Sequence, residues 1–171
     1  AIEHHIAIYS SHTAMDAYLH GVSGRMAEKL GIGDYRLLVP TGDQCGLGVI
    51  GNLPSAMTFD AFAKKVKTTF AAPYLRCIRP VEDKVSCVAM CGGAGAFMLD
   101  EAIRQGADAF LTGEMHYHEY FGHEDEIQIA VMGHYESEQF TQEVFREILA
   151  VAYPQMKIVM ATTCTNPIVV I

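Results

Sequence analysis

The sequence predicts an α/β fold, with a mixed or mainly parallel sheet flanked by helices. Short apolar runs that fit buried strands alternate with segments in which apolar residues recur every three or four positions, as on one face of a helix. The run 85–91 is almost continuously apolar, which is typical of a strand buried on both faces. It leads through the glycine-rich turn 92–95 into a helix that ends near Gly106, and then into a strand at 107–111. A strand, a helix and a strand in this order form the unit from which parallel sheets are built.

The elements before this unit are expected in the following order. A strand at 6–9 leads into a long helix that stops at Gly31. The apolar face of that helix is marked by Met15, Leu19, Val22, Met26 and Leu30. Strands at 35–39 and 47–53 surround a glycine-rich turn. A second helix, before a strand at 74–78, is marked by Phe59, Phe62, Val66 and Phe70.

The elements after the unit are two strands, at 127–132 and 157–161, with a helix between them. The residues expected on the inward face of this helix are Phe140, Val144, Phe145, Ile148 and Leu149. The chain shows no linker-like or low-complexity stretch, so residues 1–171 are interpreted as a single domain.

The strongest chemical signal is a histidine and a glutamate, His134 and Glu138, four residues apart where the last helical pattern begins. Four residues make about one helical turn, so both side chains would lie on one face and reach a single metal ion. His12 and Asp16 repeat this spacing after an earlier strand-like run. Two such pairs suggest one composite site, although a histidine or acid at a helix start also serves simply to cap the helix.

The ligand types narrow the metal. Imidazole with carboxylate suits zinc, iron, manganese or nickel, and no thiolate accompanies the two pairs. A catalytic centre therefore fits better than a structural zinc site.

A second candidate cluster lies in the segment 112–118, directly after a predicted strand, where open α/β sheets usually build their sites. Glu114 could orient a metal-bound water or a ligand imidazole, and His118 could shuttle a proton near neutral pH. The alternative is that both are solvated loop residues. The turn 92–95 could bind an anion through its backbone amides, but it lacks the lysine of a P-loop, so close packing of a helix is favoured.

Composition limits the function classes. Half of the 171 residues are apolar, enough for a substantial core, and the net charge of -8 argues against a general nucleic-acid or anionic-membrane surface. No apolar run reaches the length of a membrane-spanning helix and no signal peptide is visible, so no membrane partner is expected. The five cysteines are odd in number and contain no Cys-x-x-Cys pair, which favours reduced thiols and a cytoplasmic location.

Four segments taken together, IAIYSSHTAMDA, GLGVIGNL, VAMCGGAGAFMLDEAIRQGADAFLTGEMHYHEYF and VMGHYESE, resemble the family of GTP cyclohydrolase I type 2 homologues. This family is also called the NGG-one-interacting-factor-three-like family. The resemblance covers almost the whole chain. It implies an α/β protein with two related lobes at full length, two divalent metal ions per chain (zinc, iron or manganese), a homohexameric assembly and hydrolase activity.

Carried over by motif, Asp16, His134 and Glu138 look like metal ligands, with Glu138 the bridge between two ions. His12 looks like a site residue close to the metals, and His118 matches the family's site histidine. Glu114 stands where the family usually has Asp, so its side chain reaches one methylene further. His12, Glu114 and His118 are the candidates for proton transfer.

The sequence departs from the family in one respect. The family has a His-His pair upstream of the segment that matches His12, and His4-His5 lies too close to His12 to be that pair. The chain is therefore expected to be the C-terminal two-thirds or so of a longer protein, and an empty or partly loaded site is an open alternative.

These observations lead to two hypotheses. The first is a hydrolase that uses metal-activated water on a small, nucleotide-like substrate. The second is a non-enzymatic metal-binding scaffold or regulator whose ring-shaped assembly presents a surface to another protein.

Overall fold

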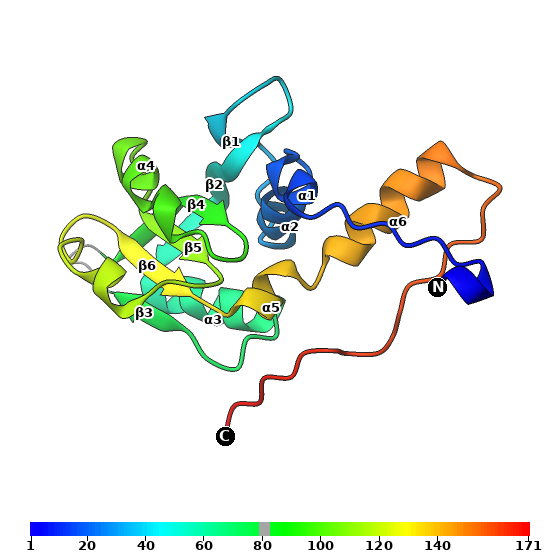
Figure 1. The fold of residues 1–171 in the computed structure, drawn as a ribbon. Coiled ribbons are helices and arrows are strands. Elements are labelled where there is room, and N and C mark those ends of the chain that lie inside the picture. The colour runs from blue at the N-terminus through cyan, green and yellow to red at the C-terminus, as the bar shows by residue number, and fades with distance from the viewer. Residues whose placement is uncertain (79–82) are drawn as a thin grey trace.

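A six-stranded mixed sheet forms the centre of the chain in a computed structural model that describes residues 1–78 and 83–171 (Figure 1). The strands are ordered β1-β2-β4-β5-β6-β3 across the sheet. Their bounds are β1 Tyr35–Pro40, β2 Gly46–Thr58, β3 Arg76–Ile78, β4 Lys84–Cys91, β5 Ala109–Thr112 and β6 Gln128–Val131. The centre, β4 to β6, is parallel, while β1, β2 and β3 pair antiparallel with their neighbours. The predicted α/β class and the parallel unit beginning at residue 85 are both confirmed.

The helices lie on both sides of this sheet. The α-helices are α1 Thr13–Ala17, α2 Val22–Lys29, α3 Phe59–Thr69, α4 Leu99–Arg104, α5 His134–Glu138 and α6 Thr141–Ala152. Single turns of 3-10 helix are η1 Ile2–His4, η2 Ala96–Met98 and η3 Tyr117–Tyr120.

Two hydrophobic clusters cover the two faces of the sheet, because side chains alternate along each buried strand. In β4, Val88 and Met90 belong to the cluster that contains the apolar residues of α2 and α3. Ala89 and Cys91 lie on the other face, with Leu99 and Ala102 of α4. Residues of β5 and β6 divide between the same two clusters, so the predicted burial of the central strands on both faces is confirmed.

The predicted long helix ending at Gly31 is broken into α1 and α2. The break occurs because Tyr18 pairs with Cys45 in an isolated bridge and the chain then turns tightly at Gly21. A Cβ at Gly21 would lie 1.8 Å from the carbonyl oxygen of Met15, so only glycine fits this turn. Periodicity continues across the break, since Met15 and Val22 are both buried.

Two predicted strands are wrong. Segments 6–9 and 157–161 are in neither a strand nor a helix. Both are apolar, but a strand forms only where another strand supplies its hydrogen bonds. Ile6, Ile8 and Val159 are exposed.

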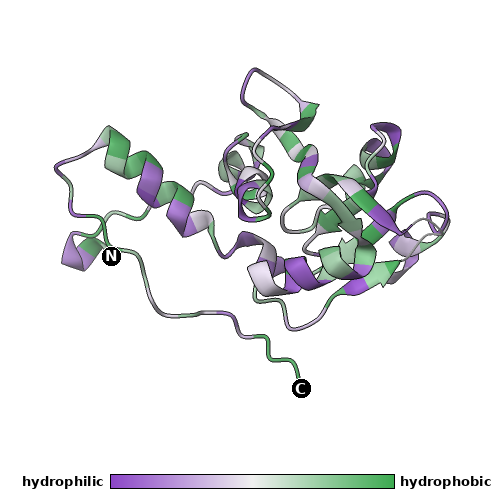
Figure 2. Ribbon diagram, turned by 180° about the vertical axis from the view of Figure 1, so that it is seen from behind, coloured by the Kyte–Doolittle hydropathy of each residue, from purple (hydrophilic) through white to green (hydrophobic). Residues whose placement is uncertain are grey.

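Helix α6 departs from the prediction of a broad inward face. Val144 is buried against Met15 and Val22, and Phe145 packs beside them as predicted, but Ile148 is 43% exposed. Charged contacts also hold α6 against α2. Arg25 of α2 pairs with Glu147 of α6. The ammonium of Lys29 lies 2.8 Å from the carboxylate of Glu143 and 4.2 Å from the centre of the Phe140 ring. The end of the tail that follows α6 is strongly apolar (Figure 2). Across the described ranges, no helix combines the length and apolarity needed to cross a membrane.

Candidate metal and catalytic site

The candidate site lies where the parallel strands β4, β5 and β6 end. Their last residues are in register, since Cys91 pairs with Thr112 and Thr112 pairs with Val131. The loop after each strand therefore emerges at the same edge of the sheet, the edge at which open α/β sheets usually bind ligands. Helix α5 begins just after β6 at this edge (Figure 1).

Gly93 ties the three loops together. Its carbonyl oxygen accepts hydrogen bonds from the backbone amides of Gly113 and Glu114, at 3.0 and 2.9 Å. Its own amide donates to the hydroxyl of Ser137 at 2.9 Å, and that hydroxyl donates to the carbonyl of His134 at 2.8 Å. Ser137 is buried, so these contacts fix the start of α5 against the glycine turn.

His134 lies between two carboxylates. Its Nδ1 is 3.2 Å from Oε2 of Glu114, and its Nε2 is 3.2 Å from Oε1 of Glu138. The contact with Glu138 spans one turn of α5, so the predicted shared face is confirmed. Glu114 reaches the same imidazole from the loop after β5.

Glycine is favoured beside this contact by its positive φ and by the close approach of two side chains. Gly93 has a φ of +63°, and a Cβ there would lie 2.5 Å from Oε1 of Glu138 and 3.4 Å from Nε2 of His134. The interpretation of the 92–95 turn as a close-packing device is supported by this crowding. The close neighbours of Gly93 are the side chains of Glu138 and His134.

Asp16 approaches the same cluster from α1. Burial raises the pKa of Asp16, and the positive charges that oppose this rise are those of His12 and His134. The charge of His134, from one predicted pair, thus acts on Asp16, from the other, and a composite metal site built from both pairs remains a prediction. His12 caps α1 from an exposed position with a φ of 45°.

In the cluster of Asp16, Glu114, His134 and Glu138, three acids surround one imidazole. Burial raises the pKa of Glu138, and the charges of Asp16 and Glu114 raise it further. Burial alone would lower the pKa of His134, but its hydrogen bond to Glu114 and the charges of Glu138, Glu114 and Asp16 raise it above its usual value. A centre of positive charge would relieve this repulsion.

His118 lies in the 3-10 turn η3. It is exposed and stacks on His116, with ring centroids 5.7 Å apart. Within the described residues, no contact joins His118 to the acidic residues Asp16, Glu114 and Glu138. The predicted role of His118 in proton transfer therefore remains a prediction.

The donor chemistry of the cluster fits a divalent metal ion, since imidazole nitrogen and carboxylate oxygen are ligands for zinc, iron and manganese. The arrangement is not closed, however. Residues 1–78 and 83–171 contain no group of three or more His, Cys, Asp or Glu side chains arranged to hold an ion. Both ring nitrogens of His134 are instead engaged by carboxylates.

Two adjoining cavities open beside the cluster. One, of about 220 Å³, is lined by His134, Glu114, Glu136, Arg76 and the apolar tail residues 168–170, among others. The other, of about 520 Å³, is lined by Arg76, Phe97, Glu114, Met115, His116 and Glu119, together with Ala94 and Ala96. Glu114 and Arg76 belong to both walls. A substrate near His134 would therefore meet these two side chains.

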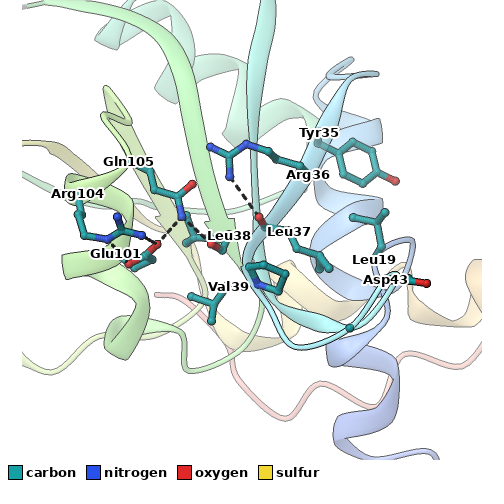
Figure 3. Close-up of a pocket in the computed structure, with 12 residues that line it drawn as sticks. Leu19, Tyr35, Arg36, Leu37, Leu38, Val39, Asp43, Glu101, Arg104 and Gln105 are labelled. Atoms are coloured by element: carbon teal, nitrogen blue, oxygen red, sulfur yellow. Dashed lines mark hydrogen bonds and ion pairs between the residues drawn. The ribbon is translucent and has the colours of Figure 1, made fainter.

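A larger cavity, of about 790 Å³, lies elsewhere, along β1 and α4 (Figure 3). Glu101 in its wall is already paired with Arg104 and accepts a hydrogen bond from Gln105, and Arg36 donates to the carbonyl of Leu37. It shares no lining residue with the two cavities beside His134. Size alone therefore does not identify the site.

Two further residues contribute to the site. Ser137 lies three positions after His134, and this spacing could have indicated that it supports the same turn. Arg76 begins β3, and only the pairing of β3 with β6 reveals its position at the site.

Comparison with known proteins identifies the relatives. The family model described as Duf34/NIF3 (NGG1p interacting factor 3) matches residues 1–167. A protein of Streptococcus pneumoniae serotype 4 named GTP cyclohydrolase 1 type 2 homolog is 38% identical over 121 residues, which make up 68% of this chain and 45% of that relative. A protein of the same name from Nostoc sp. is 32% identical over 143 residues, 81% of this chain and 54% of that relative.

The chain thus spans about half the length of these curated relatives. Among solved structures, Staphylococcus aureus protein SA1388 superposes with a TM-score of 0.86 at 19% identity, over 99% of this chain and 71% of that one. At this identity the likeness establishes the shared fold.

Proposed function

Because the chain belongs to the Duf34/NIF3 family, we propose that it carries part of the active site of a metal-dependent hydrolase acting on a small, nucleotide-like substrate. One observation supports the proposal above the others: an imidazole held between two carboxylates at the carboxyl ends of parallel strands, with a third, partly buried carboxylate close by. Such a concentration of acids lowers stability unless a cation compensates it, so it is typical of a functional site.

Asp16, His134 and Glu138 are the residues that we propose would hold the divalent ions. Glu114 has a supporting role in this arrangement. Its Oε2 accepts a hydrogen bond from Nδ1–H of His134, which fixes the orientation of the ring and makes Nε2 the nitrogen that would bind a metal. Nε2 of His134 and Oε1 of Glu138 are in contact in the structure, so this contact would have to open for both groups to bind a metal ion.

Divalent ions in such a site supply Lewis acidity, which lowers the pKa of water and polarises a carbonyl or phosphoryl oxygen. The side chains of the chain handle the protons. In hydrolysis, the water oxygen bonds to the electrophilic carbon or phosphorus, one water proton is taken up by a base, and the leaving group is protonated as its bond breaks. Glu114, His118 and His12 are the proposed groups for these transfers. The name of the relatives points to GTP, and a phosphoester or a cyclic amide fits the same chemistry.

The rival function is a metal-binding scaffold or regulator in a homo-oligomer. The lack of a closed group of ligands among the described residues favours it, because a scaffold does not require a complete catalytic centre. Under this alternative, metal binds without turnover and a partner protein occupies the surface of the assembly.

Elemental analysis of the purified chain, after loading with zinc, manganese or iron(II) and dialysis, tests the metal site. The wild type should retain up to about two ions per chain, as in a two-metal hydrolytic centre. Glu138→Gln should lower this content while the folded state persists by circular dichroism. Glu126→Gln is the matched control, because Glu126 also pairs with a histidine, His123, at 3.0 Å, but in an exposed loop.

Turnover is then measured with GTP, a panel of phosphoesters and a panel of cyclic amides. A hydrolase should lose turnover in Glu138→Gln and keep it in Glu126→Gln. Metal binding without turnover on any panel would favour the scaffold. Failure of the wild type to retain any metal would reject the proposal for this chain.

A further inference from the structure

Arg76 occupies a position at the site that its place in the sequence does not reveal. It starts the edge strand β3, which runs antiparallel to β6, and its pairing partner is Val131, the last residue of β6. His134 follows Val131 by only three residues. The antiparallel pairing therefore brings the guanidinium-bearing strand end to the edge of the sheet where His134 and Glu114 lie.

The side chain of Arg76 is available for a ligand. It is exposed, and within the described residues it makes no hydrogen bond or ion pair. It lines both cavities beside the site and is the sole Lys or Arg among the described residues that line them. Glu114, Glu119 and Glu136 line one cavity or the other, so an anionic ligand would be repelled without this cation.

The larger of the two cavities has a wall suited to a flat ring. Phe97 lines it and is 66% exposed, and His116 lines it as well. The His116 ring is stacked on that of His118 with an angle of only 3° between their planes. The backbone amide of His116 donates to the carboxylate of Glu119, which fixes the start of this turn. Exposed aromatic faces in a preformed pocket are typical of stacking sites for planar ligands.

We propose that Arg76 binds the oxyanion of the substrate, a phosphate or a carboxylate, while the pocket of Phe97 and His116 holds a flat ring of the same molecule. This inference deepens the proposed function and rests on it for the location of the reacting bond, which would lie near Glu114. The guanidinium fork matches two oxygens of a phosphate or carboxylate at once, which a lysine ammonium does not.

A structural role for Arg76 is the alternative. Charged side chains on edge strands prevent pairing with other molecules, and β3 is an edge strand. Under this alternative, removal of Arg76 changes solubility or stability but does not change the preference between a charged and an uncharged ligand.

Two matched ligand pairs distinguish these roles: GMP with guanosine, and orotate with uracil. Each pair shares a ring and differs in the phosphate or the carboxylate. Dissociation constants are measured by calorimetry on the zinc-loaded chain and on the chelated chain. The variants are Arg76→Ala, Arg76→Lys and Phe97→Ala. Arg36→Ala is the control, because Arg36 is an exposed arginine of the opposite edge strand and lines the other cavity.

In the wild type, at least one anion should bind more tightly than its uncharged partner. Arg76→Ala should weaken that anion by about 10- to 100-fold, the range of a hydrogen-bonded charge, and leave the uncharged ligand unchanged. Arg76→Lys should restore part of the loss. Phe97→Ala should weaken both members of the pair, and Arg36→Ala should weaken neither.

The inference is overturned if Arg76→Ala and Arg36→Ala bind the anions equally well, or if the wild type binds none of the four ligands. Its failure can be told from failure of the proposed function. Binding that depends on Arg76 in a chain without metal or turnover supports the inference and rejects the hydrolase. Normal metal content and turnover in Arg76→Ala, with unchanged affinity for the anions, reject the inference alone.

Discussion

The two histidine-carboxylate pairs have the same spacing in the sequence but different surroundings in the structure. His134 and Glu138 belong to one regular helix, and their side chains are in contact. His12 stands outside the helix that contains Asp16, in an exposed position with a positive φ. Among the described residues, a hydrogen bond or ion pair between the two side chains is thus found for His134 and Glu138 but not for His12 and Asp16, although the spacing is the same.

The difference arises from what precedes each pair. His134 follows β6, which is paired on both sides, and the hydroxyl of Ser137 holds the start of α5 against Gly93. His12 follows the exposed, unpaired segment 6–9. A strand with two neighbours fixes the direction in which the next helix begins, whereas an unpaired segment leaves that direction to local contacts.

The largest expected difference between the two pairs is in metal affinity after the histidine of each pair is removed. His134→Ala removes a proposed ligand and should weaken zinc binding by more than about 100-fold, beyond the usual effect of an outer-shell change. His12→Ala should weaken it by less than about 10-fold, since His12 acts on Asp16 through charge alone. Competition with a chromophoric chelator measures both constants. Equal losses would mean that the two pairs contribute alike, contrary to their surroundings.

The tight packing around Glu138 provides the next test. Gly93→Ala and Gly106→Ala both place a Cβ on a residue of positive φ, at +63° and +75°, so each should destabilise the fold by about 1 to 3 kcal/mol. A Cβ at residue 93 also meets the Glu138 carboxylate at 2.5 Å, whereas nothing lies within 4 Å of one at residue 106. Metal affinity should therefore fall in Gly93→Ala alone.

Urea unfolding and zinc titration of both variants check this expectation. If Gly106→Ala loses as much metal affinity as Gly93→Ala, general destabilisation rather than crowding of Glu138 would explain the loss.

Local patterns in the sequence were enough to predict one pair and most of the sheet. The contact of His134 with Glu138 depends on a single helical turn, and the apolar run 85–91 identifies a central strand by itself. The strands at 6–9 and 157–161 could not be judged in this way, because a strand depends on a partner elsewhere in the chain.

Contacts between segments far apart in the sequence could not be predicted from residue spacing. Glu114 reaches His134 because β5 and β6 are parallel neighbours, and Arg76 reaches the same edge because β3 is antiparallel to β6. The break between α1 and α2 has no local signal for a similar reason: the bridge from Tyr18 to Cys45 joins residues far apart in sequence.

Glu114 links the stronger pair to the next strand, and its loss should have an intermediate effect. Glu114→Gln keeps the size of the side chain but weakens the hydrogen bond to Nδ1 of His134. Zinc affinity should fall by about 10-fold or more, the range for an outer-shell partner of a ligating histidine. Glu119→Gln is the control, because Glu119 lines the same cavity but bonds to the backbone of His116. An unchanged affinity in Glu114→Gln would show that Glu114 does not orient the ring.

The smallest expected effect concerns Cys91, whose pKa is influenced by one acid from each histidine-carboxylate pair. Burial raises the pKa of the Cys91 thiol to about 12 from an ordinary value of 9.0, and the charges of Asp16 and Glu138 add to the rise. Since the folded pKa lies above the unfolded one, the neutral thiol contributes stability below pH 9, and this contribution is lost as the pH rises toward 12.

At pH 8.5, iodoacetamide should modify the exposed Cys45 and leave Cys91 unmodified, as measured by peptide mass spectrometry. At pH 10, Asp16→Asn should increase modification of Cys91 at least as much as Glu138→Gln does, because the charge of Asp16 is the larger of the two influences. A response to Glu138→Gln alone would place Asp16 outside the cluster and separate the two pairs.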